Sequence, residues 1–168
     1  NLPIYLFTWK IAPALAVGNC VIGKPSELTP MTAYLLSKIC MESGLPAGVL
    51  NIVHGSGDKV GSALVNHSDI SAISFTGGTE TGRSIAKSIA GKFKKVSLEM
   101  GGKNPAIVYP DCNYEKTLSA LIKSSFSNQG QICLCSSRLL IHKNIYDKFK
   151  SDFVNKVKKL SVGDPFKI

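Results

Sequence analysis

Cys133 is the side chain with the strongest potential for covalent chemistry, and it closes a loop that runs over residues 128–133. A thiol acts as a nucleophile when it is partly exposed and has a base and an oxyanion-binding site beside it. A cysteine without a disulfide partner is, however, most often a small buried hydrophobic side chain. The loop by itself leaves both interpretations open.

Two carboxylates lie at the ends of two different predicted strands. Glu99 closes the strand over residues 96–99, two residues before the glycine pair Gly101-Gly102, and is either a solvated acid or a participant in chemistry. Glu27 follows the first predicted strand. An acid at that place can accept hydrogen bonds from a ribose diol and would repel a 2′-phosphate, which favours NAD over NADP.

Three short turns follow predicted strands and could face a ligand. They are Lys24-Pro25-Ser26-Glu27, Gly55-Ser56-Gly57 and Thr76-Gly77-Gly78-Thr79. Ligands of open parallel sheets bind beyond the carboxyl ends of the strands, and the amides of a helix N-terminus favour anions. None of the turns matches the dinucleotide-binding G-x-G-x-x-G pattern or a phosphate-binding P-loop. The pattern alone therefore favours ordinary strand-to-helix turns.

Strands and helices alternate over the part of the chain that must position these groups. Strands are expected over residues 17–24, 48–53, 70–76 and 96–99, with helices between them. Thr29 is expected to cap the first of these helices, which Pro30 begins and Gly44 ends. This order predicts an α/β fold with a Rossmann-like parallel sheet and helices on both faces.

The alternation breaks at Gly101-Gly102, and we place a domain boundary there. Beyond it we expect a strand over residues 105–109, a helix over 114–126, a strand over 138–142 and a basic helix from Ile145. This order predicts the start of a second α/β domain, which carries Cys133.

The composition restricts the classes of protein to which the sequence can belong. Of its 168 residues, 44% are hydrophobic and 18% are charged. No apolar run approaches the roughly 20 residues of a membrane span, so we expect no membrane partner. Five scattered cysteines indicate a reducing compartment, and we expect a cytoplasmic protein. The histidines stand singly, so we expect no metal.

The net charge of +9 raises the question of a nucleic-acid partner. Many of the lysines belong to the expected basic helix, whose other face carries Phe149, Phe153 and Val157. Such lysines form the solvated face of an amphipathic helix, and no aromatic residues are interleaved with them for base stacking. We therefore expect no nucleic-acid partner.

Taken together, several segments closely resemble the aldehyde dehydrogenase superfamily along the whole chain. They lie at residues 9–16, 24–30, 44–49, 75–77, 98–103 and 128–133, and the last two resemble the family's glutamate and cysteine signatures. Segments 75–79, 103–107 and 131–138 look most like the 2-aminomuconic and 2-hydroxymuconic semialdehyde dehydrogenases. That resemblance implies a semialdehyde substrate that already bears a carboxylate, with retinal and betaine aldehyde relatives as alternatives.

The resemblance implies a role for each candidate residue. Cys133 would attack the aldehyde to give a thiohemiacetal, whose oxyanion is stabilised by the Cys133 backbone N–H and the side-chain amide of Asn1. Hydride transfer to NAD would leave a thioester, and Glu99 would activate the water that hydrolyses it. The implied cofactor-binding residues are Lys24, Pro25, Ser26, Glu27, Thr76, Gly77 and Gly78.

The resemblance also implies two domains and an oligomeric state. Residues 1–100 would form part of an NAD-binding domain, and residues 101–168 the N-terminal part of the catalytic domain. The sequence does not begin with Met, and we expect a fragment that is inactive alone. Its parent would take a small-molecule aldehyde and form a homodimer or homotetramer.

Two departures and two alternative functions accompany the resemblance. Many relatives carry Ser in place of Gly78, so one hydroxyl contact to the cofactor pyrophosphate would be lost. Cys135 is the alternative nucleophile. CoA-acylating semialdehyde dehydrogenases lack a hydrolytic glutamate, so Glu99 argues against that function. A relative that binds cofactor without turnover is the other alternative, and the presence of Asn1, Glu99 and Cys133 together argues against it.

Overall fold

The structure, a computed structural model, describes residues 1–164 and 166–167. The chain divides into two compact units. One comprises Leu2–Gly101, and the other comprises Gly102–Ile168 together with Asn1. Among the residues described, none of the helices combines the length and the apolar character that crossing a bilayer requires.

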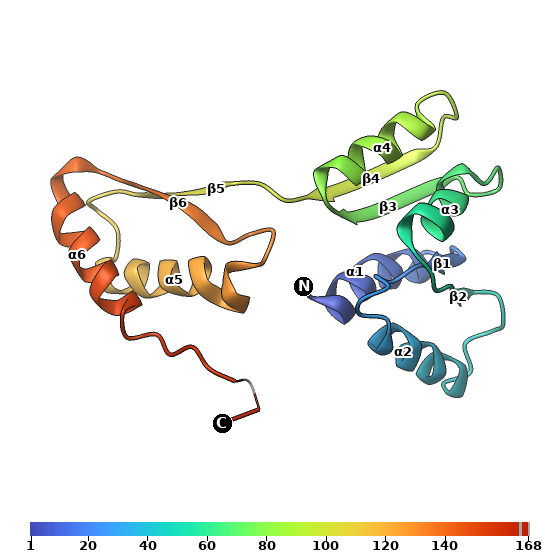
Figure 1. Cartoon of the computed structure of the whole chain (residues 1–168), viewed down its shortest axis with the longest axis horizontal. Helices are drawn as coiled ribbons and strands as arrows, with labels where there is room; N and C mark the ends of the chain where they lie inside the picture. The colour runs from blue at the N-terminus through green and yellow to red at the C-terminus, as the bar shows by residue number, and fades with distance from the viewer. Residues whose placement is uncertain (165, 168) are drawn as a thin grey trace. The chain divides into compact units, whose positions relative to one another are not determined.

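The unit Leu2–Gly101 alternates helices with parallel strands (Figure 1). In chain order it contains α1 (Pro3–Ala16), β1 (Val21–Gly23), α2 (Met31–Glu42), β2 (Leu50–Ile52), the π-helical turn η1 (Gly57–Gly61), α3 (Ser62–Asn66), β3 (Ala72–Gly77), α4 (Thr79–Ile89) and β4 (Lys95–Met100). The strands pair as β1 with β2 and β3 with β4. The predicted α/β fold with parallel strands is confirmed, and its strands form hydrogen-bonded pairs in place of one continuous ladder.

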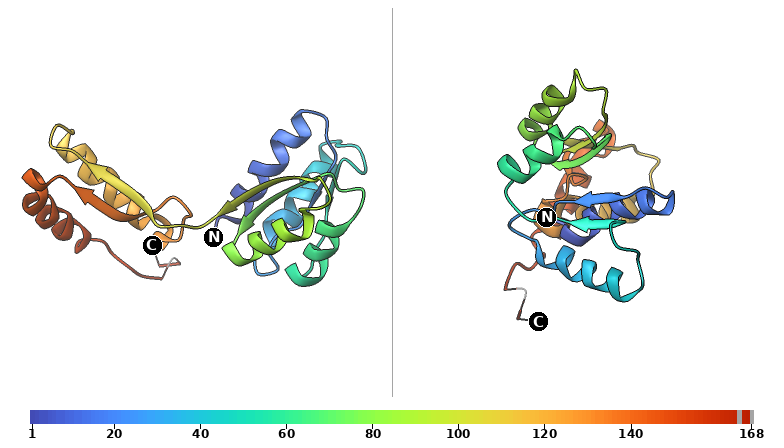
Figure 2. Two further views of the ribbon diagram at one scale, coloured as in Figure 1. Left: turned by 90° about the horizontal axis from the view of Figure 1, so that it is seen from above. Right: turned by 90° about the vertical axis from the view of Figure 1, so that its right-hand side faces the viewer.

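Helices cover these strand pairs and fix where their ends lie. Helix α1 contacts β1, α2 contacts β2, and α4 contacts both β3 and β4 (Figure 2). The buried side chains at these contacts include Ile11 of α1, Ala33 of α2, and Ile85 and Ile89 of α4. Burial of such apolar surface stabilises a fold by about 25 cal/mol per Å². The turns after β1 and β3 are thereby anchored on packed elements.

Helix α2 ends as the sequence predicts and begins differently. Gly44 has a φ of +81°, the left-handed backbone that glycine adopts without a Cβ penalty at the end of a helix. The prediction that Thr29 caps the helix is wrong, because Pro30 occupies the N-cap position and no side chain accepts a capping hydrogen bond. The Thr29 N–H donates instead to the Ser26 carbonyl at 3.2 Å, so Thr29 belongs to a preceding turn.

The sequence patterns did not predict α1. Its sequence, PIYLFTWKIAPALA, is apolar on nearly every side and contains Pro13. It therefore lacks the alternation of polar and apolar faces by which a surface helix is recognised. Pro3 lies in the first turn, where the missing N–H leaves no helical hydrogen bond unmade.

The second unit packs two helices on one parallel strand pair. Its elements are β5 (Asn104–Val108), α5 (Tyr114–Phe126), the 3₁₀ turn η2 (Ser127–Gly130), β6 (Ser136–Ile141), the 3₁₀ turn η3 (Lys143–Ile145) and α6 (Tyr146–Val157). Val108, Leu118 and Phe149 form the core and are 2%, 1% and 0% exposed. The core thus joins β5 to α5 and α6.

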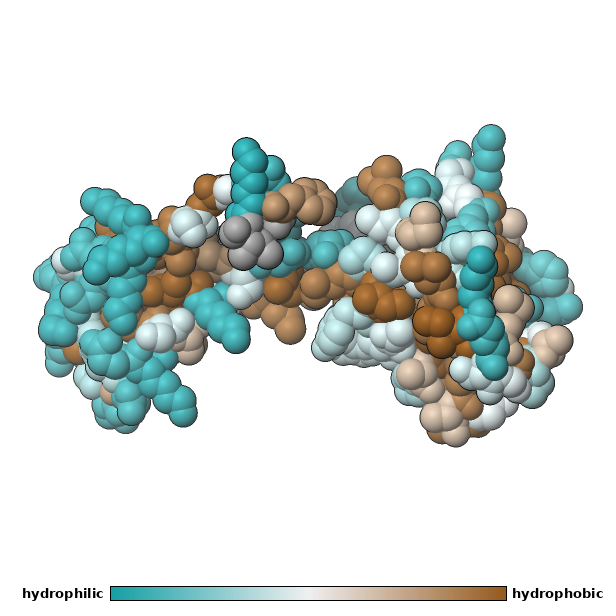
Figure 3. Space-filling model, turned by 90° about the horizontal axis from the view of Figure 1, so that it is seen from below, coloured by the Kyte–Doolittle hydropathy of each residue, from teal (hydrophilic) through white to brown (hydrophobic). Residues whose placement is uncertain are grey.

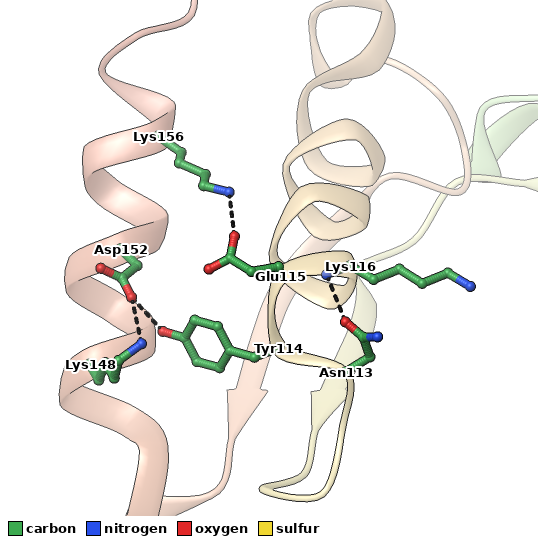
Figure 4. Close-up of polar contacts among 7 residues, drawn as sticks. All are labelled: Asn113, Tyr114, Glu115, Lys116, Lys148, Asp152 and Lys156. Atoms are coloured by element: carbon green, nitrogen blue, oxygen red, sulfur yellow. Dashed lines mark hydrogen bonds and ion pairs between the residues drawn. The ribbon is translucent and has the colours of Figure 1, made fainter.

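Polar contacts also join α5 to α6 (Figure 4). The Tyr114 hydroxyl donates to the Asp152 carboxylate at 2.6 Å, and Lys148 Nζ donates to the same oxygen at 3.1 Å. Lys148 is exposed while Phe149 beside it is fully buried. The predicted amphipathic pattern of this basic helix is therefore confirmed.

Candidate active site

The turn Lys24–Glu27 follows β1 at the carboxyl end of the β1–β2 pair. Lys24 Nζ donates to the carbonyl oxygens of Pro25 at 2.7 Å and Gly55 at 2.9 Å, and it lies 3.5 Å from Glu27 Oε2. Because Gly55 follows β2, Lys24 ties the two strand ends together. The Glu27 side chain is 54% exposed, which leaves its carboxylate accessible to a ligand.

A cavity of about 370 Å³ opens beside this turn. Its lining residues are Pro25, Glu27, Pro30, Met31, Tyr34, His54 and Gly55. Ser26 is not among them, and its Oγ accepts a hydrogen bond from the Leu28 N–H at 3.3 Å within the turn. A mostly apolar hollow with one carboxylate, at the carboxyl end of parallel strands, suits the adenosine half of a dinucleotide.

The turn Thr76-Gly77-Gly78 joins β3 to α4. Thr76 pairs in register with Glu99 of β4, and Gly78 is the N-cap residue of α4. A Cβ added at Gly77 would lie 2.5 Å from the Phe75 ring, so a side chain at this position would require that ring to move. Nothing lies within 4 Å of a Cβ added at Gly78. Its φ of −68° and ψ of 146° suit any side chain.

Glu99 is an exposed residue of β4, and Lys10 of α1 lies within electrostatic reach of it. Partial burial lowers the pKa of Lys10, and the negative charge of Glu99 acts in the opposite direction by favouring the ammonium form. Lys10 Nζ donates to Ser74 Oγ at 2.8 Å. In the sequence, the only signal at Lys10 was its place within the segment 9–16.

The loop before Cys133 has an unusual backbone. Three consecutive residues have positive φ angles, namely Asn128 at 50°, Gln129 at 56° and Gly130 at 72°. Residues with a Cβ seldom adopt this left-handed conformation, and they keep it only where their surroundings enforce it. Cys133 then lies in a turn closed by the Cys135 N–H, which donates to the Ile132 carbonyl at 3.1 Å.

Two asparagine side chains hold this turn. Asn104, the first residue of β5, donates from Nδ2 to the carbonyl oxygens of Cys133 at 2.5 Å and Cys135 at 3.2 Å. The Asn1 side-chain amide donates to the Gln131 carbonyl. In the sequence, Asn104 stood out only as part of the segment 103–107, although its place two residues after Gly102 was a signal that could have identified it.

The two thiols of the turn differ in their surroundings. Cys133 is partly exposed, whereas Cys135 is 7% exposed and its Sγ donates to the Ser127 carbonyl at 3.6 Å. Both are free thiols. A dissolved substrate can therefore reach the sulfur of Cys133 more readily than that of Cys135.

The candidate residues form separate groups within the two units. Lys24 and Glu27 contact one another beside the cavity, and Thr76 is the register partner of Glu99, all within Leu2–Gly101. In the other unit, the Asn1 amide contacts the backbone two residues before Cys133. Among the residues that the structure describes, no three His, Cys, Asp or Glu side chains gather as they would around a metal ion.

Comparisons with known proteins give a consistent result. Residues 1–168 match the model of the family described as Aldehyde dehydrogenase family. The 2-aminomuconic semialdehyde dehydrogenase of Homo sapiens is 53% identical over 165 residues, which are 98% of this chain and 34% of that protein. The 2-hydroxymuconic semialdehyde dehydrogenase of Pseudomonas putida is 46% identical over 166 residues, with shares of 98% and 34%.

A solved structure also matches this chain over nearly its whole length. Betaine aldehyde dehydrogenase from Staphylococcus aureus, in complex with NAD⁺, has a TM-score of 0.90 at 38% identity. The match covers 96% of this chain and 32% of that one. The chain therefore spans about one third of the length of the relatives it matches.

Proposed function

Because the chain belongs to the aldehyde dehydrogenase family, we propose that the full-length protein oxidises an aldehyde to a carboxylic acid with NAD⁺ as the oxidant. The observation that carries this proposal is the turn at Cys133. A partly exposed thiol follows three left-handed residues, and Asn104 holds two carbonyls of the turn. A strained loop that presents an accessible thiol is typical of a nucleophile.

Cys133 is the proposed nucleophile. Its thiolate adds to the aldehyde carbon, and the oxyanion of the resulting thiohemiacetal accepts hydrogen bonds from the Cys133 backbone N–H and the Asn1 amide. That amide has two N–H donors, of which the contact with Gln131 uses one. When bound, NAD⁺ accepts the hydride, and Cys133 is left as a thioester. Glu99 takes a proton from the water that attacks the thioester, which releases the acid and restores the thiol.

The cofactor-binding residues of this proposal lie in the unit Leu2–Gly101. The cavity beside Lys24–Glu27 receives the adenosine ribose, and the turn Thr76–Gly78 offers the amides at the start of α4 to the pyrophosphate. Glu27 accepts hydrogen bonds from the ribose diol and repels a 2′-phosphate, which favours NAD⁺. The NAD⁺ complex of the Staphylococcus aureus relative supports this proposal.

The substrate proposed is a semialdehyde that carries a carboxylate. The names of the relatives from Homo sapiens and Pseudomonas putida, both muconic semialdehyde dehydrogenases, support it. Residues 1–100 are then part of the NAD-binding domain, and residues 101–168 are the N-terminal part of the catalytic domain. The parent is proposed to be a homodimer or a homotetramer.

Substitution of the two thiols in the full-length protein tests the nucleophile. Cys133→Ala should abolish NADH formation and leave the dissociation constant for NAD⁺ nearly unchanged, because the cavity beside Glu27 is untouched. Cys135→Ala is the matched control and should keep turnover, since that thiol is only 7% exposed. Normal turnover in Cys133→Ala, together with loss of turnover in Cys135→Ala, would show that Cys135 is the nucleophile.

A Glu99→Gln variant tests the hydrolytic step. Gln keeps the shape and can still hydrogen-bond, but it cannot take a proton. The steady rate should fall by about 10²–10⁴-fold, while rapid mixing still shows a burst of NADH and intact-mass measurement shows an acyl adduct on Cys133. Wild-type steady turnover without an adduct would reject Glu99 as the base and favour a CoA-acylating enzyme.

A further inference from the structure

The cavity beside Glu27 contains a second ionisable side chain, His54, that the proposed function does not use. Glu27 follows β1 and His54 follows β2, and these strands are hydrogen-bonded in parallel. Both side chains therefore reach the same hollow from neighbouring strand ends. The hollow takes the adenosine ribose in the proposed function, so His54 would line the ribose site together with Glu27.

Lys24 is committed to the protein. Lys24 Nζ donates hydrogen bonds to the Pro25 carbonyl at 2.7 Å and the Gly55 carbonyl at 2.9 Å, and it forms an ion pair with Glu27 Oε2 at 3.5 Å. Its charge is offset by Glu27, and its side chain is only 16% exposed. The lining group that can add a positive charge to the cavity is then His54.

We propose that His54 is a specificity-determining residue, whose protonation weakens the preference of this cavity for NAD⁺ over NADP⁺. The inference rests on the proposed function. With neutral His54, the Glu27 carboxylate repels the 2′-phosphate of NADP⁺. The imidazolium form supplies a cation and an N–H donor that can bind that phosphate. Histidine is the side chain that ordinarily changes charge between pH 5 and 8, so the preference should depend on pH.

Charged and titratable groups reach the neighbourhood of the cavity from several elements. Glu27 and Lys24 come from the turn after β1, and Tyr34 contributes a phenol ring from α2. Lys38 of α2 holds its Nζ 4.8 Å from the centre of that ring, and its charge stays constant between about pH 6 and pH 8. Asp58, in η1, is the next acid after His54 along the chain. A hydrogen bond from Ser56 lowers the pKa of Asp58 and keeps it an anion over the range of the test. Its charge therefore stays constant over the test.

The test measures kcat/KM and dissociation constants of the full-length protein for NAD⁺ and NADP⁺ at about pH 8 and about pH 6. In the wild type the NAD⁺-to-NADP⁺ preference should fall by roughly tenfold or more on acidification, since a hydrogen bond to a charged group is worth about 1.5–3 kcal/mol. In His54→Gln the fall should be much smaller. The 2′-phosphate itself titrates near pH 6, equally in both proteins, so the difference between them isolates His54.

His67→Gln is the matched control, because His67 follows α3 and does not line the cavity. It should show the wild-type pH dependence. The dissociation constant for NAD⁺ at about pH 8 serves as the folding check. If His54→Gln does not bind NAD⁺ like the wild type at that pH, His54→Phe is measured in its place. If the NAD⁺-to-NADP⁺ preference has the same pH dependence in the wild type and in the folded variant, the role of His54 is overturned while the proposed function stands. A wild type that binds neither dinucleotide would reject the proposed function itself.

Discussion

Gly77 and Gly78 are adjacent residues of one turn, and they differ in the space available for a side chain. A side chain at Gly77 would collide with the Phe75 ring, whereas a Cβ at Gly78 would meet nothing within 4 Å. Gly78 is also the N-cap of α4, where no side chain supplies a capping hydrogen bond. Serine is among the preferred residues at such a position because its oxygen accepts from the first free amides of the helix. Gly78 is therefore a place where a hydroxyl could be added.

A Gly78→Ser substitution should tighten cofactor binding in the full-length protein. One added hydrogen bond to the anionic pyrophosphate contributes about 1.5–3 kcal/mol, so the dissociation constant for NAD⁺ should fall by roughly 10- to 100-fold. A titration followed by fluorescence measures it. Gly78→Ala is the control, because it adds the Cβ without the hydroxyl. Equal tightening by Ala and Ser would show that the hydroxyl is not the cause.

At the scale of elements, the α5–α6 contact combines an apolar core with a charged hydrogen-bond network. The hydrogen bond from Tyr114 is the largest cause that lowers the pKa of Asp152, followed by that from Lys148 (Figure 4). A carboxyl group with a lowered pKa stabilises the fold above its unfolded pKa, about 3.9. That contribution is lost as the pH falls through the folded pKa.

A Tyr114→Phe substitution should therefore destabilise the protein in a pH-dependent way. At neutral pH the Tm should fall by roughly 2 °C, and the difference from the wild type should shrink as the pH falls through the folded pKa of Asp152, which lies below its unfolded value. Thermal unfolding at several pH values measures it. Tyr109→Phe is the matched control, since Tyr109 is 61% exposed. A Tm difference that persists in acid would contradict the assigned network.

At the scale of the whole molecule, apolar side chains are exposed in both units (Figure 3). Trp9 is 58% exposed, Phe93 is 98% exposed and Ile107 is 64% exposed. Extensive exposed apolar surface marks a place for interaction with other protein. The relatives are about three times longer than this chain, which covers 34% of their length. Much of this surface is therefore expected to be covered in the full-length protein.

We expect these 168 residues to form no NADH from aldehyde when produced alone, in contrast to the activity proposed for the full-length protein. The reason is that this chain spans only 34% of the length of its relative from Homo sapiens, so a site that needs the rest of that length would be incomplete. The isolated chain should also bind an apolar fluorescent dye more strongly, per mole, than the full-length protein. Steady-state assays and dye titration of both proteins measure this. Turnover by the isolated chain would refute the expectation.

Local patterns predicted the elements that have one apolar and one polar face. The helix expected over residues 114–126 coincides with α5, whose N-cap Asn113 accepts a hydrogen bond from the Lys116 N–H. Helix α1 was missed because it is apolar on nearly every side. Thr29 was misassigned as a cap because a capping residue and a turn residue look alike until the backbone of Pro30 is known.

The sequence by itself determined which chemistry each position can offer: a thiol at Cys133, and carboxylates at Glu27 and Glu99. These are local properties, since side-chain type and short-range backbone preference do not depend on the rest of the chain.

Only the tertiary structure decided which residues these side chains contact within the chain. Lys24 bonds to a carbonyl 31 residues away, Asn104 bonds to the Cys133 carbonyl 29 residues away, and His54 shares a cavity with Glu27. Such partners are set by how helices pack on paired strands, which brings distant strand ends together. No local pattern encodes that arrangement, because it depends on the packing of each whole unit.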